Sequence, residues 1–324
     1  MPRVSIAIPV YNGERFLRPA IDSLLAQTFR DFELVISDNA STDGTETICR
    51  EYVARDPRVR YFRQPRNLGG PANFTGVFHL CTGEYHKWST ADDYWDPTMV
   101  EKCVAVLDRH PDVVLAYPKT CLEDEWGGLL REYHDRLDLQ DDSPSARFIT
   151  LLSTAGLCHA QLGLIRRRAM LRTGLMGREL ASDLRFLAEL SLYGKFTVIP
   201  EFLFHRRFHA DCASWDRESM EHQRKYYDPE HRSMFGLHTW RRYLHLVAAV
   251  TRAPIAGREK VRLYRFLARR TVRDRERLWR EVRVFIGLPA PSPTAGASPL
   301  PPVPGLPQPT PLAHRADEAV RRAS

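Results

Sequence analysis

Two adjacent carboxylates, Asp92 and Asp93, stand in the stretch STADDYW directly after an apolar, aromatic run. Helix capping does not explain them, because Asp96 followed by Pro97 already provides an ordinary helix start. Two close carboxylates repel each other unless they share a cation. Mg²⁺ and Mn²⁺ prefer oxygen ligands and are often held by one or two carboxylates together with substrate phosphates. The pair is therefore a candidate metal site at a phosphate-bearing substrate, and two ordinary surface acids are the alternative.

A second polar cluster, PVYNGER, follows the first apolar run of the chain. Tyr11 offers an aromatic face on which a base could stack, and Asn12 and Glu14 offer hydrogen-bonding groups. The alternative is a plain strand-to-helix turn, for which the pair Asn12 and Gly13 is well suited. The cluster contains neither G-x-G-x-x-G nor a P-loop, which argues against a dinucleotide-dependent oxidoreductase.

A third polar cluster, SDNASTDGT, contains Asp38 and Asn39. Its later residues, from Ser41 to Asp43, are the types that a helix N-terminus favours, and Glu46 completes a possible capping box with Asp43. Asp38 and Asn39 come too early for that cap, so they could contact a ribose or a base edge.

The elements that would position these clusters alternate along the first half of the chain. Apolar runs predict strands at residues 4–10, 32–37, 59–63, 84–88 and 112–118, and helical spacing predicts helices at 16–25, 43–54, 71–80 and from Asp96 onward. This alternation predicts an α/β fold with a mostly parallel sheet and helices on both faces. Because ligands of such sheets bind outside the carboxyl ends of the strands, the three clusters should converge.

The second half of the chain is less regular. Residues 119–145 resemble a polar excursion, 146–175 a mixed segment, 181–194 an amphipathic helix and 216–286 a run of helices. Ten prolines among residues 289–311 predict a disordered tail, since such a segment cannot build a core.

Composition indicates one large domain with an appendage. The chain has 324 residues, 43% of them hydrophobic, which is enough for a sizeable core. Its six cysteines form no C-x-x-C pair, so neither a zinc site nor a disulfide framework is indicated, and a reducing cytoplasm fits this usage. No window reaches the roughly 18 apolar residues of a membrane span.

The positive charge is concentrated near the C-terminal end. Residues 258–283 contain eleven Lys or Arg and four Asp or Glu, and their balance of +7 equals that of the whole chain. The basic character therefore belongs to one segment. A solvated helix face docked on the body is the first interpretation, and contact with an anionic membrane is the alternative.

Six motifs, in order, resemble the family 2 glycosyltransferases. They are PVYNGERFL, SDNASTDGT, NLGGPANF, ADDYWDP, ASDLRFL and RRFHADCAS. The resemblance spans roughly residues 3–215 and implies a GT-A fold. The implied organisation is a nucleotide-sugar half (1–118), an acceptor half (119–215), a basic helical segment (216–287) and a Pro-rich tail (288–324).

The resemblance implies roles where positions match the motifs. Asp93 stands at the metal-ligating position of the D-x-D motif, with Thr90 where the first acid is often found, and Asp92 would orient the sugar or ribose. His209 would lie close to the metal and diphosphate, and Asp183 would be the catalytic base. The implied nucleotide- and donor-binding residues are Pro9, Tyr11, Asn12, Glu14, Asp38, Asn39, Asn67, Asn73 and Asp92.

Two of these residues have an ordinary explanation when the motifs are set aside. Asp183 would be a first-turn helix acid favoured by the helix dipole, and His209 a surface residue. Asn39 departs from the family pattern, which is Asp-Asp in many members, so the choice of base stays open.

The implied activity is an inverting transfer of sugar from a nucleotide-diphosphate donor, most simply a UDP-sugar, to an acceptor hydroxyl, with Mg²⁺ or Mn²⁺ on the diphosphate and Asp183 as general base. The acceptor could be a glycan, a lipid-linked glycan or a small molecule. We expect a cytoplasmic protein with no nucleic-acid partner and leave open a peripheral contact with the inner face of the membrane through residues 258–283.

Two alternatives compete with this interpretation. A sugar nucleotidyltransferase would be expected to carry a Gly-rich, basic loop where this chain has PVYNGER. A catalytically inactive binding module would use the basic segment on nucleic acid or anionic lipid, although the joint presence of Asp93, Asp183 and His209 argues against an inactive site.

Overall fold

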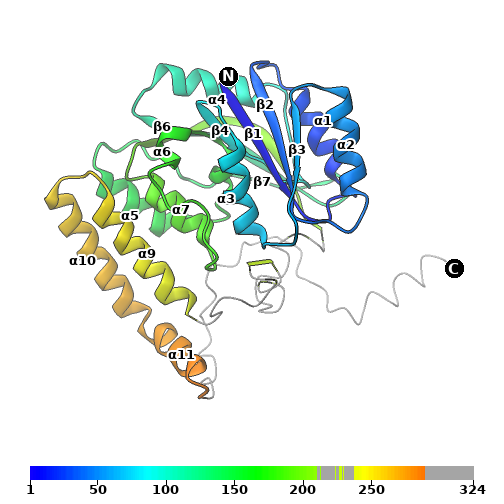
Figure 1. Ribbon diagram of the computed structural model, residues 1–324. Coiled ribbons are helices and arrows are strands. Elements are labelled where there is room, and N and C mark those ends of the chain that lie inside the picture. Colours follow the sequence, from blue (N-terminus) through cyan, green and yellow to red (C-terminus); the bar gives the residue numbers. More distant parts are fainter. Residues whose placement is uncertain (210–211, 213–222, 224–225, 228, 230–236, 289–324) are drawn as a thin grey trace.

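A computed structural model describes residues 1–209, 212, 223, 226–227, 229 and 237–288 (Figure 1). Among these residues the strands are β1 (Val4–Val10), β2 (Phe32–Asp38), β3 (Val59–Arg63), β4 (Tyr85–Trp88), β5 (Tyr94–Trp95), β6 (Val113–Glu123), β7 (Leu129–Tyr133), β8 (Leu164–Arg166) and β9 (Lys195–Arg207). The helices are α1 (Leu17–Leu25), α2 (Thr45–Arg55), α3 (Gly70–Leu80), α4 (Met99–Arg109), α5 (Pro144–Thr154), α6 (Arg167–Met170), α7 (Ser182–Leu190), α9 (His238–Arg252), α10 (Gly257–Arg273) and α11 (Arg275–Phe285), and η1 (His159–Leu162) is a 3-10 turn.

One sheet contains all of these strands, in the order β3-β2-β1-β4-β8-β6-β9-β5, with β7 paired to β6. The first four strands are mutually parallel, and every residue of β1, β2 and β4 is buried. The largely apolar sequence of β1 predicts this burial, whereas β4 buries His86 and Lys87 as well. The chain moves outward from β1 to β3 and then returns to β4 on the other side of β1. This reversal between β1 and β4 creates a topological switch point.

Helices cover both faces of this part of the sheet, as the alternating pattern predicts. The connections through α1 and α2 step in one direction across the sheet, and the connection through α3 steps in the other, so right-handed crossovers place α3 on the opposite face (Figure 1). The predicted strands of this half are confirmed to within a residue at most ends.

Two predicted helix starts were wrong. α2 begins at Thr45 without a side-chain cap, because the carboxylate of Asp43 accepts hydrogen bonds from the backbone N–H groups of Glu14 and Thr45. α4 begins only at Met99, and the carboxylate of Asp96 instead contacts His205 Nε2 at 3.1 Å.

The second half of the sheet is mixed rather than parallel. β8 runs antiparallel to both β4 and β6, whereas β6 and β9 are parallel partners. The prediction of a polar excursion from residue 119 was wrong at its start, because β6 continues to Glu123 and forms an antiparallel pair with β7.

Three helices extend the fold at the end of the described chain. α9 packs against α7, α10 packs against α5 and α9, and α11 packs against α9, and Figure 1 shows them on the side of the molecule away from α1 and α2. No helix within the described residues is long and apolar enough to cross a membrane. The predicted boundary at 215/216 and residues 289–324 of the predicted tail lie outside the described residues.

Candidate active site

The loops that follow β1 and β2 are locked to each other. The side-chain oxygen of Asn12 accepts a hydrogen bond from the N–H of Thr42 at 2.8 Å, and the Asn12 N–H donates to the Ser41 hydroxyl at 2.9 Å. Glu14 accepts from the N–H of Gly44 at 2.8 Å. Asn12 adopts a left-handed backbone (φ 51°), which its short polar side chain tolerates. Both predicted side chains therefore hold the neighbouring loop in place.

The side chain of Tyr11 is accessible to solvent. It is 48% exposed at the end of β1, whereas Pro9 is buried inside that strand. An aromatic ring at this position is free to contact a ligand at the switch point.

Asp38 is buried at the end of β2 and its carboxylate is already hydrogen-bonded. One oxygen accepts from the Tyr61 hydroxyl at 2.7 Å and from the Arg63 guanidinium at 2.8 Å, and the other accepts from the Ser41 N–H at 2.8 Å. Arg63 also forms the ion pair that balances the buried charge. Asp38 thus fixes the shape of the second loop.

Three asparagines connect this loop to the segment NLGGPANF. Asn39 donates to the Asn67 side-chain oxygen at 2.7 Å and accepts from the Leu68 N–H at 2.9 Å. Asn73, on α3, donates to the Ser37 carbonyl at 2.8 Å and accepts from the Ser37 hydroxyl at 2.6 Å. The structure therefore brings Asn39, Asn67 and Asn73 together at the carboxyl end of β2.

The two glycines of this segment make room for a tyrosine from the C-terminal half. A Cβ atom on Gly70 would collide with the ring of Tyr226, and Gly69 has a positive φ of 86°. The pKa of Tyr226 is raised by burial and by the charges of Asp183 and Asp92. Tyr226 consequently lies near both carboxylates and over the start of α3.

Asp92 and Asp93 lie in the loop after β4 and are held by residues at the end of β9. Asp93 is 3% exposed and accepts hydrogen bonds from the Thr90 hydroxyl at 2.5 Å and the Arg207 N–H at 2.9 Å. Asp92 contacts His209 Nε2 at 3.0 Å, and its carbonyl accepts from the Arg207 guanidinium at 2.8 Å. The structure thus joins the adjacent pair Asp92 and Asp93, through Asp92, to His209, which lies 117 residues further along the chain.

The charges at this pair are only partly balanced. Burial, followed by the nearby charge of Asp92, raises the pKa of Asp93 to about 7. Burial acts against ionisation of Asp92 as well, but the hydrogen bond and charge of His209 lower its pKa below the ordinary value. Nδ1 of His209 is buried and has no hydrogen-bond partner within the described part of the chain. A bound cation would relieve this excess of negative charge.

Asp183 lies in the first turn of α7 and accepts a hydrogen bond from the Leu184 N–H at 2.8 Å. The preceding Ala181 has a left-handed backbone (φ 60°), a conformation that persists only where the surroundings impose it. On the buried side of α7, Arg185 pairs with Glu189 one turn later and with Glu179 before the helix, and all three side chains are buried. This ion network anchors the turn that carries Asp183.

Sequence reasoning missed three residues of this region. Arg207 holds the carboxylate pair, and the charge of Arg206 lowers the pKa of Asp93. Both arginines belong to the quoted motif RRFHADCAS, so their position before His209 was an available signal. Nothing in the sequence indicated Tyr226.

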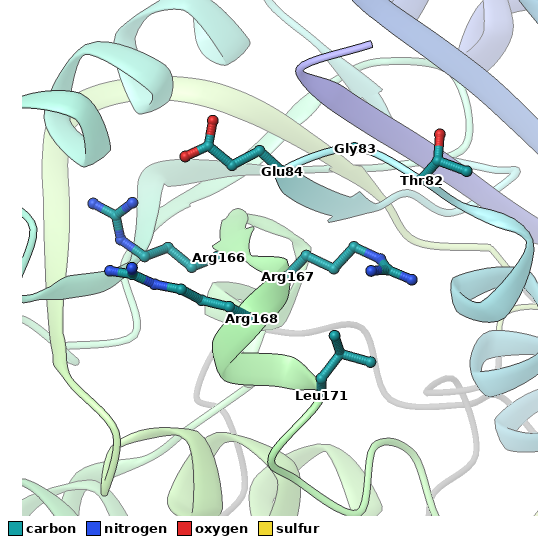
Figure 2. A pocket seen from close by; sticks show the side chains of 7 residues that line it. All are labelled: Thr82, Gly83, Glu84, Arg166, Arg167, Arg168 and Leu171. Atoms are coloured by element: carbon teal, nitrogen blue, oxygen red, sulfur yellow. The ribbon is translucent and has the colours of Figure 1, made fainter. Parts of the chain in front are cut away.

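A separate pocket lies at the amino-terminal end of β4. It is lined by Thr82, Gly83, Glu84, Arg166, Arg167, Arg168 and Leu171, and Figure 2 shows Arg167 pointing away from the other two arginines. Because residues 82–84 precede β4 whereas Asp92 and Asp93 follow it, this pocket is not part of the candidate site. Arg166 donates to the carbonyls of Val113, Leu107 and His110 and so has a structural role.

Comparison with known sequences identifies one protein family. The family model described as "Glycosyl transferase family 2" matches residues 5–172. An uncharacterized protein of Mycobacterium tuberculosis is 41% identical over 117 residues, which are 35% of this chain and 34% of that protein. The chondroitin synthase of Escherichia coli is 29% identical over 216 residues, 66% of this chain and 30% of that enzyme. The matched part of the chain thus spans about a third of the length of these relatives.

Solved structures show the same fold at low sequence identity. Residues 1–349 of TarS from S. aureus, in complex with UDP-GlcNAc, match with a TM-score of 0.62 and 17% identity over 88% of this chain and 80% of that one. The mannosyltransferase PcManGT from Pyrobaculum calidifontis, in complex with GDP-Man and Mn²⁺, matches with a TM-score of 0.51 and 17% identity over 100% of this chain and 81% of that one. At this identity the likeness concerns the fold.

Proposed function

Because the chain belongs to glycosyl transferase family 2 and has the α/β architecture of its GT-A neighbours, we propose that it transfers a sugar from a nucleotide-diphosphate donor to an acceptor hydroxyl. The observation that carries the proposal is the contact of His209 with Asp92, the neighbour of Asp93, beside the switch point of the sheet. The nucleotide sugars bound by the two structural neighbours support this donor class, and a UDP-sugar is the donor we favour.

The residues of the pair fit a divalent cation. The carboxylate of Asp93 is under-compensated in charge, and the buried Nδ1 of His209 lacks a partner in the described chain. No three acidic, His or Cys side chains converge on one point within the described residues, so the protein would supply only some of the ligands and the diphosphate the others. Asp93 and His209 would hold Mg²⁺ or Mn²⁺, which supplies positive charge to stabilise the leaving diphosphate.

The nucleotide would lie against the interlocked loops of β1 and β2. Tyr11 offers its accessible ring to the base. Asn12, Glu14, Asp38, Asn39, Asn67 and Asn73 would form and support the walls of the donor site, since their polar groups fix the loops to one another. Asp92, held between His209 and Arg207, would orient the sugar.

Asp183 would serve as the general base. It would accept the proton of the acceptor hydroxyl as that oxygen forms its bond to the anomeric carbon, while the bond from that carbon to the diphosphate breaks and its electron pair leaves with the diphosphate. A single displacement of this kind inverts the anomeric configuration. The proximity of Asp183 and Asp92 to Tyr226 supports this assignment.

The acceptor would be a glycan, a lipid-linked glycan or a small molecule, and transfer would take place in the cytoplasm. The spacing of the six cysteines, with no C-x-x-C pair among them, fits a reducing compartment. The loop after β1 carries no Gly-rich basic segment, so nucleotidyl transfer is not favoured.

The metal assignment is tested by thermal unfolding with UDP. A ligand that binds only the native state raises the melting temperature, so UDP should stabilise the protein more with Mn²⁺ or Mg²⁺ than with a chelator. Asp93→Ala should abolish the metal-dependent part and reduce turnover. Asp31→Ala, at an exposed acid before β2, is the matched control and should behave like the wild type. Metal-dependent binding and turnover that survive Asp93→Ala would refute the assignment.

A further inference from the structure

The outer side of α9, α10 and α11 carries large apolar side chains that are exposed. They are Trp240, Leu244 and Val247 on α9, Val261, Tyr264 and Val272 on α10, Trp279 on α11, and Ile286 directly after it, each 36–64% exposed. We refer to these eight residues as the apolar band. Single exposed apolar residues are common, but a contiguous group often marks an interaction surface.

Contacts between the helices bring parts of the band together. The Tyr264 hydroxyl lies 2.9 Å from the Thr251 hydroxyl, which places the outer sides of α9 and α10 together. Trp240 Nε1 donates to the Leu278 carbonyl at 3.0 Å and so connects α9 to α11. Leu263, Leu267 and Leu278 are buried against the body. Packing of these helices is therefore already satisfied without the band.

A row of arginines borders the band on α10. Arg258, Arg262, Arg265, Arg269 and Arg273 are all exposed and recur every three or four residues, which places them on one face of the helix. Arg265 is four residues after Val261, and Arg269 is three before Val272, so the row is adjacent to the apolar positions. We refer to these five residues as the basic row.

Three of the four acids of this segment accept hydrogen bonds from α9 or from the start of α5. Glu259 accepts from the Ser143 hydroxyl and the Ser145 N–H at 2.8 and 3.0 Å. Asp274 accepts from the Tyr243 hydroxyl at 2.5 Å, and Glu281 from the Thr239 N–H at 2.9 Å. Of the four acids between residues 258 and 283, only Glu276 is exposed. The outward charge is consequently more positive than the composition of the segment suggests.

We propose that the apolar band and the basic row together bind the surface of an anionic membrane. The band would enter the boundary between head groups and acyl chains, and the basic row would lie on the anionic head groups. Interfacial helices combine these two features, and tryptophan favours this depth. The proposal is independent of sugar transfer and concerns where the protein works.

Charge favours a membrane over other occupants of the face. In a symmetric dimer formed through this face, the basic row of one copy would lie near that of the other, and like charges would repel. A nucleic acid would use the arginines but would leave the aliphatic side chains of the band exposed to water. An anionic lipid surface complements both.

Co-sedimentation of the full chain with vesicles tests the proposal. We expect binding to vesicles of phosphatidylcholine with phosphatidylserine, little binding to phosphatidylcholine alone, and loss of binding when salt is raised from about 0.1 M to about 1 M, because the Debye length falls from about 10 Å to about 3 Å. Arg265→Glu/Arg269→Glu should weaken binding at least about tenfold. Trp279→Ser should weaken vesicle binding but leave its dependence on salt unchanged.

Matched variants control for general effects of charge and exposed tryptophan. Arg55→Glu/Arg109→Glu reverses two exposed arginines on α2 and α4, and Trp126→Ser removes a tryptophan that is 82% exposed on the β6–β7 turn. Both should bind like the wild type, and melting curves confirm that each variant is folded. Absence of vesicle binding, or binding unchanged by the band and row variants, would overturn the proposal. Concentration-dependent dimers that Trp279→Ser dissolves would instead identify a second copy as the occupant.

Discussion

At the scale of single residues, the proposed chemistry depends on one proton acceptor. Asp183→Asn keeps the size and most hydrogen bonding of the side chain but removes the base, so turnover should fall by a factor of about 10²–10⁴. The metal-dependent stabilisation by UDP should remain, because the donor residues are unchanged. Initial rates at saturating donor and acceptor, with thermal unfolding in parallel, measure both quantities.

Glu201→Gln, at an exposed acid on β9, is the control for loss of one carboxylate and should retain wild-type turnover. Near-normal rates in Asp183→Asn would show that another group removes the proton. The anomeric configuration of the product gives an independent measurement, and retention of configuration would exclude the single-displacement scheme.

The sequence could indicate individual site residues but not how they contact one another. The motif order related Asp92 and Asp93 to His209, and the structure brings Asp92 and His209 within 3.0 Å. The contact of Asp93 with the Arg207 N–H could not be foreseen, because it depends on where β9 ends relative to the loop after β4. A backbone donor leaves no trace in side-chain patterns.

At the scale of elements, the position of Asp183 depends on the ion network on the buried side of α7. Arg185→Met removes the buried cation that Glu179 and Glu189 share, which should cost about 3–5 kcal/mol of unfolding free energy. Arg252→Ala removes a partner of Glu189 whose side chain is 55% exposed and should cost less than about 1 kcal/mol. Urea unfolding of both variants measures the difference, and equal losses would contradict the assigned role of the buried pair.

Sequence patterns predicted some of the strands and helix starts but not others. β1 and the centre of β2 were predictable because strands buried on both faces have largely apolar sequences. β7 was not, because LLREY is largely exposed, lacks the alternation of a half-buried strand, and is held by backbone pairing with β6. The late start of α4 likewise reflects the contact of Asp96 with His205, which no local pattern contains.

At the scale of the whole molecule, the fold decides which charged side chains of the basic segment face the solvent, and composition does not show this. The balance of +7 in residues 258–283 was visible in the sequence, and it favoured a solvated helix face docked on the body. Docking occurs, since Leu263 and Leu267 are buried. The contacts of the acidic side chains could not be predicted. Glu259, Asp274 and Glu281 bind groups at α5 and α9, which lie far away in sequence.

Three buried titratable groups predict how the stability of the whole molecule depends on pH. His86, in β4, is fully buried between the rings of Phe78 and Trp88, and neither ring nitrogen has a hydrogen-bond partner in the described chain. Burial, with the charges of Arg167 and Lys87, lowers the pKa of His86 to about 3. Burial likewise lowers the pKa of His238 to about 4. Burial acts against ionisation of Glu179, but the hydrogen bond from His245 and the charge of Arg185 lower its pKa to about 2.

All three groups bind protons more readily in the unfolded chain, so the free energy of unfolding should fall as pH decreases. For the histidines the loss begins near their ordinary pKa of about 6.5, and for Glu179 near about 4.5. His86→Leu removes a buried imidazole that cannot be satisfied, so it should leave stability at neutral pH unchanged or slightly higher and flatten the decline between about pH 6.5 and 4.5. Urea midpoints at about pH 7, 5.5 and 4.5 measure this slope. His134→Leu, at an exposed histidine, should keep the wild-type slope, and an equally steep decline in His86→Leu would show that other groups control acid stability.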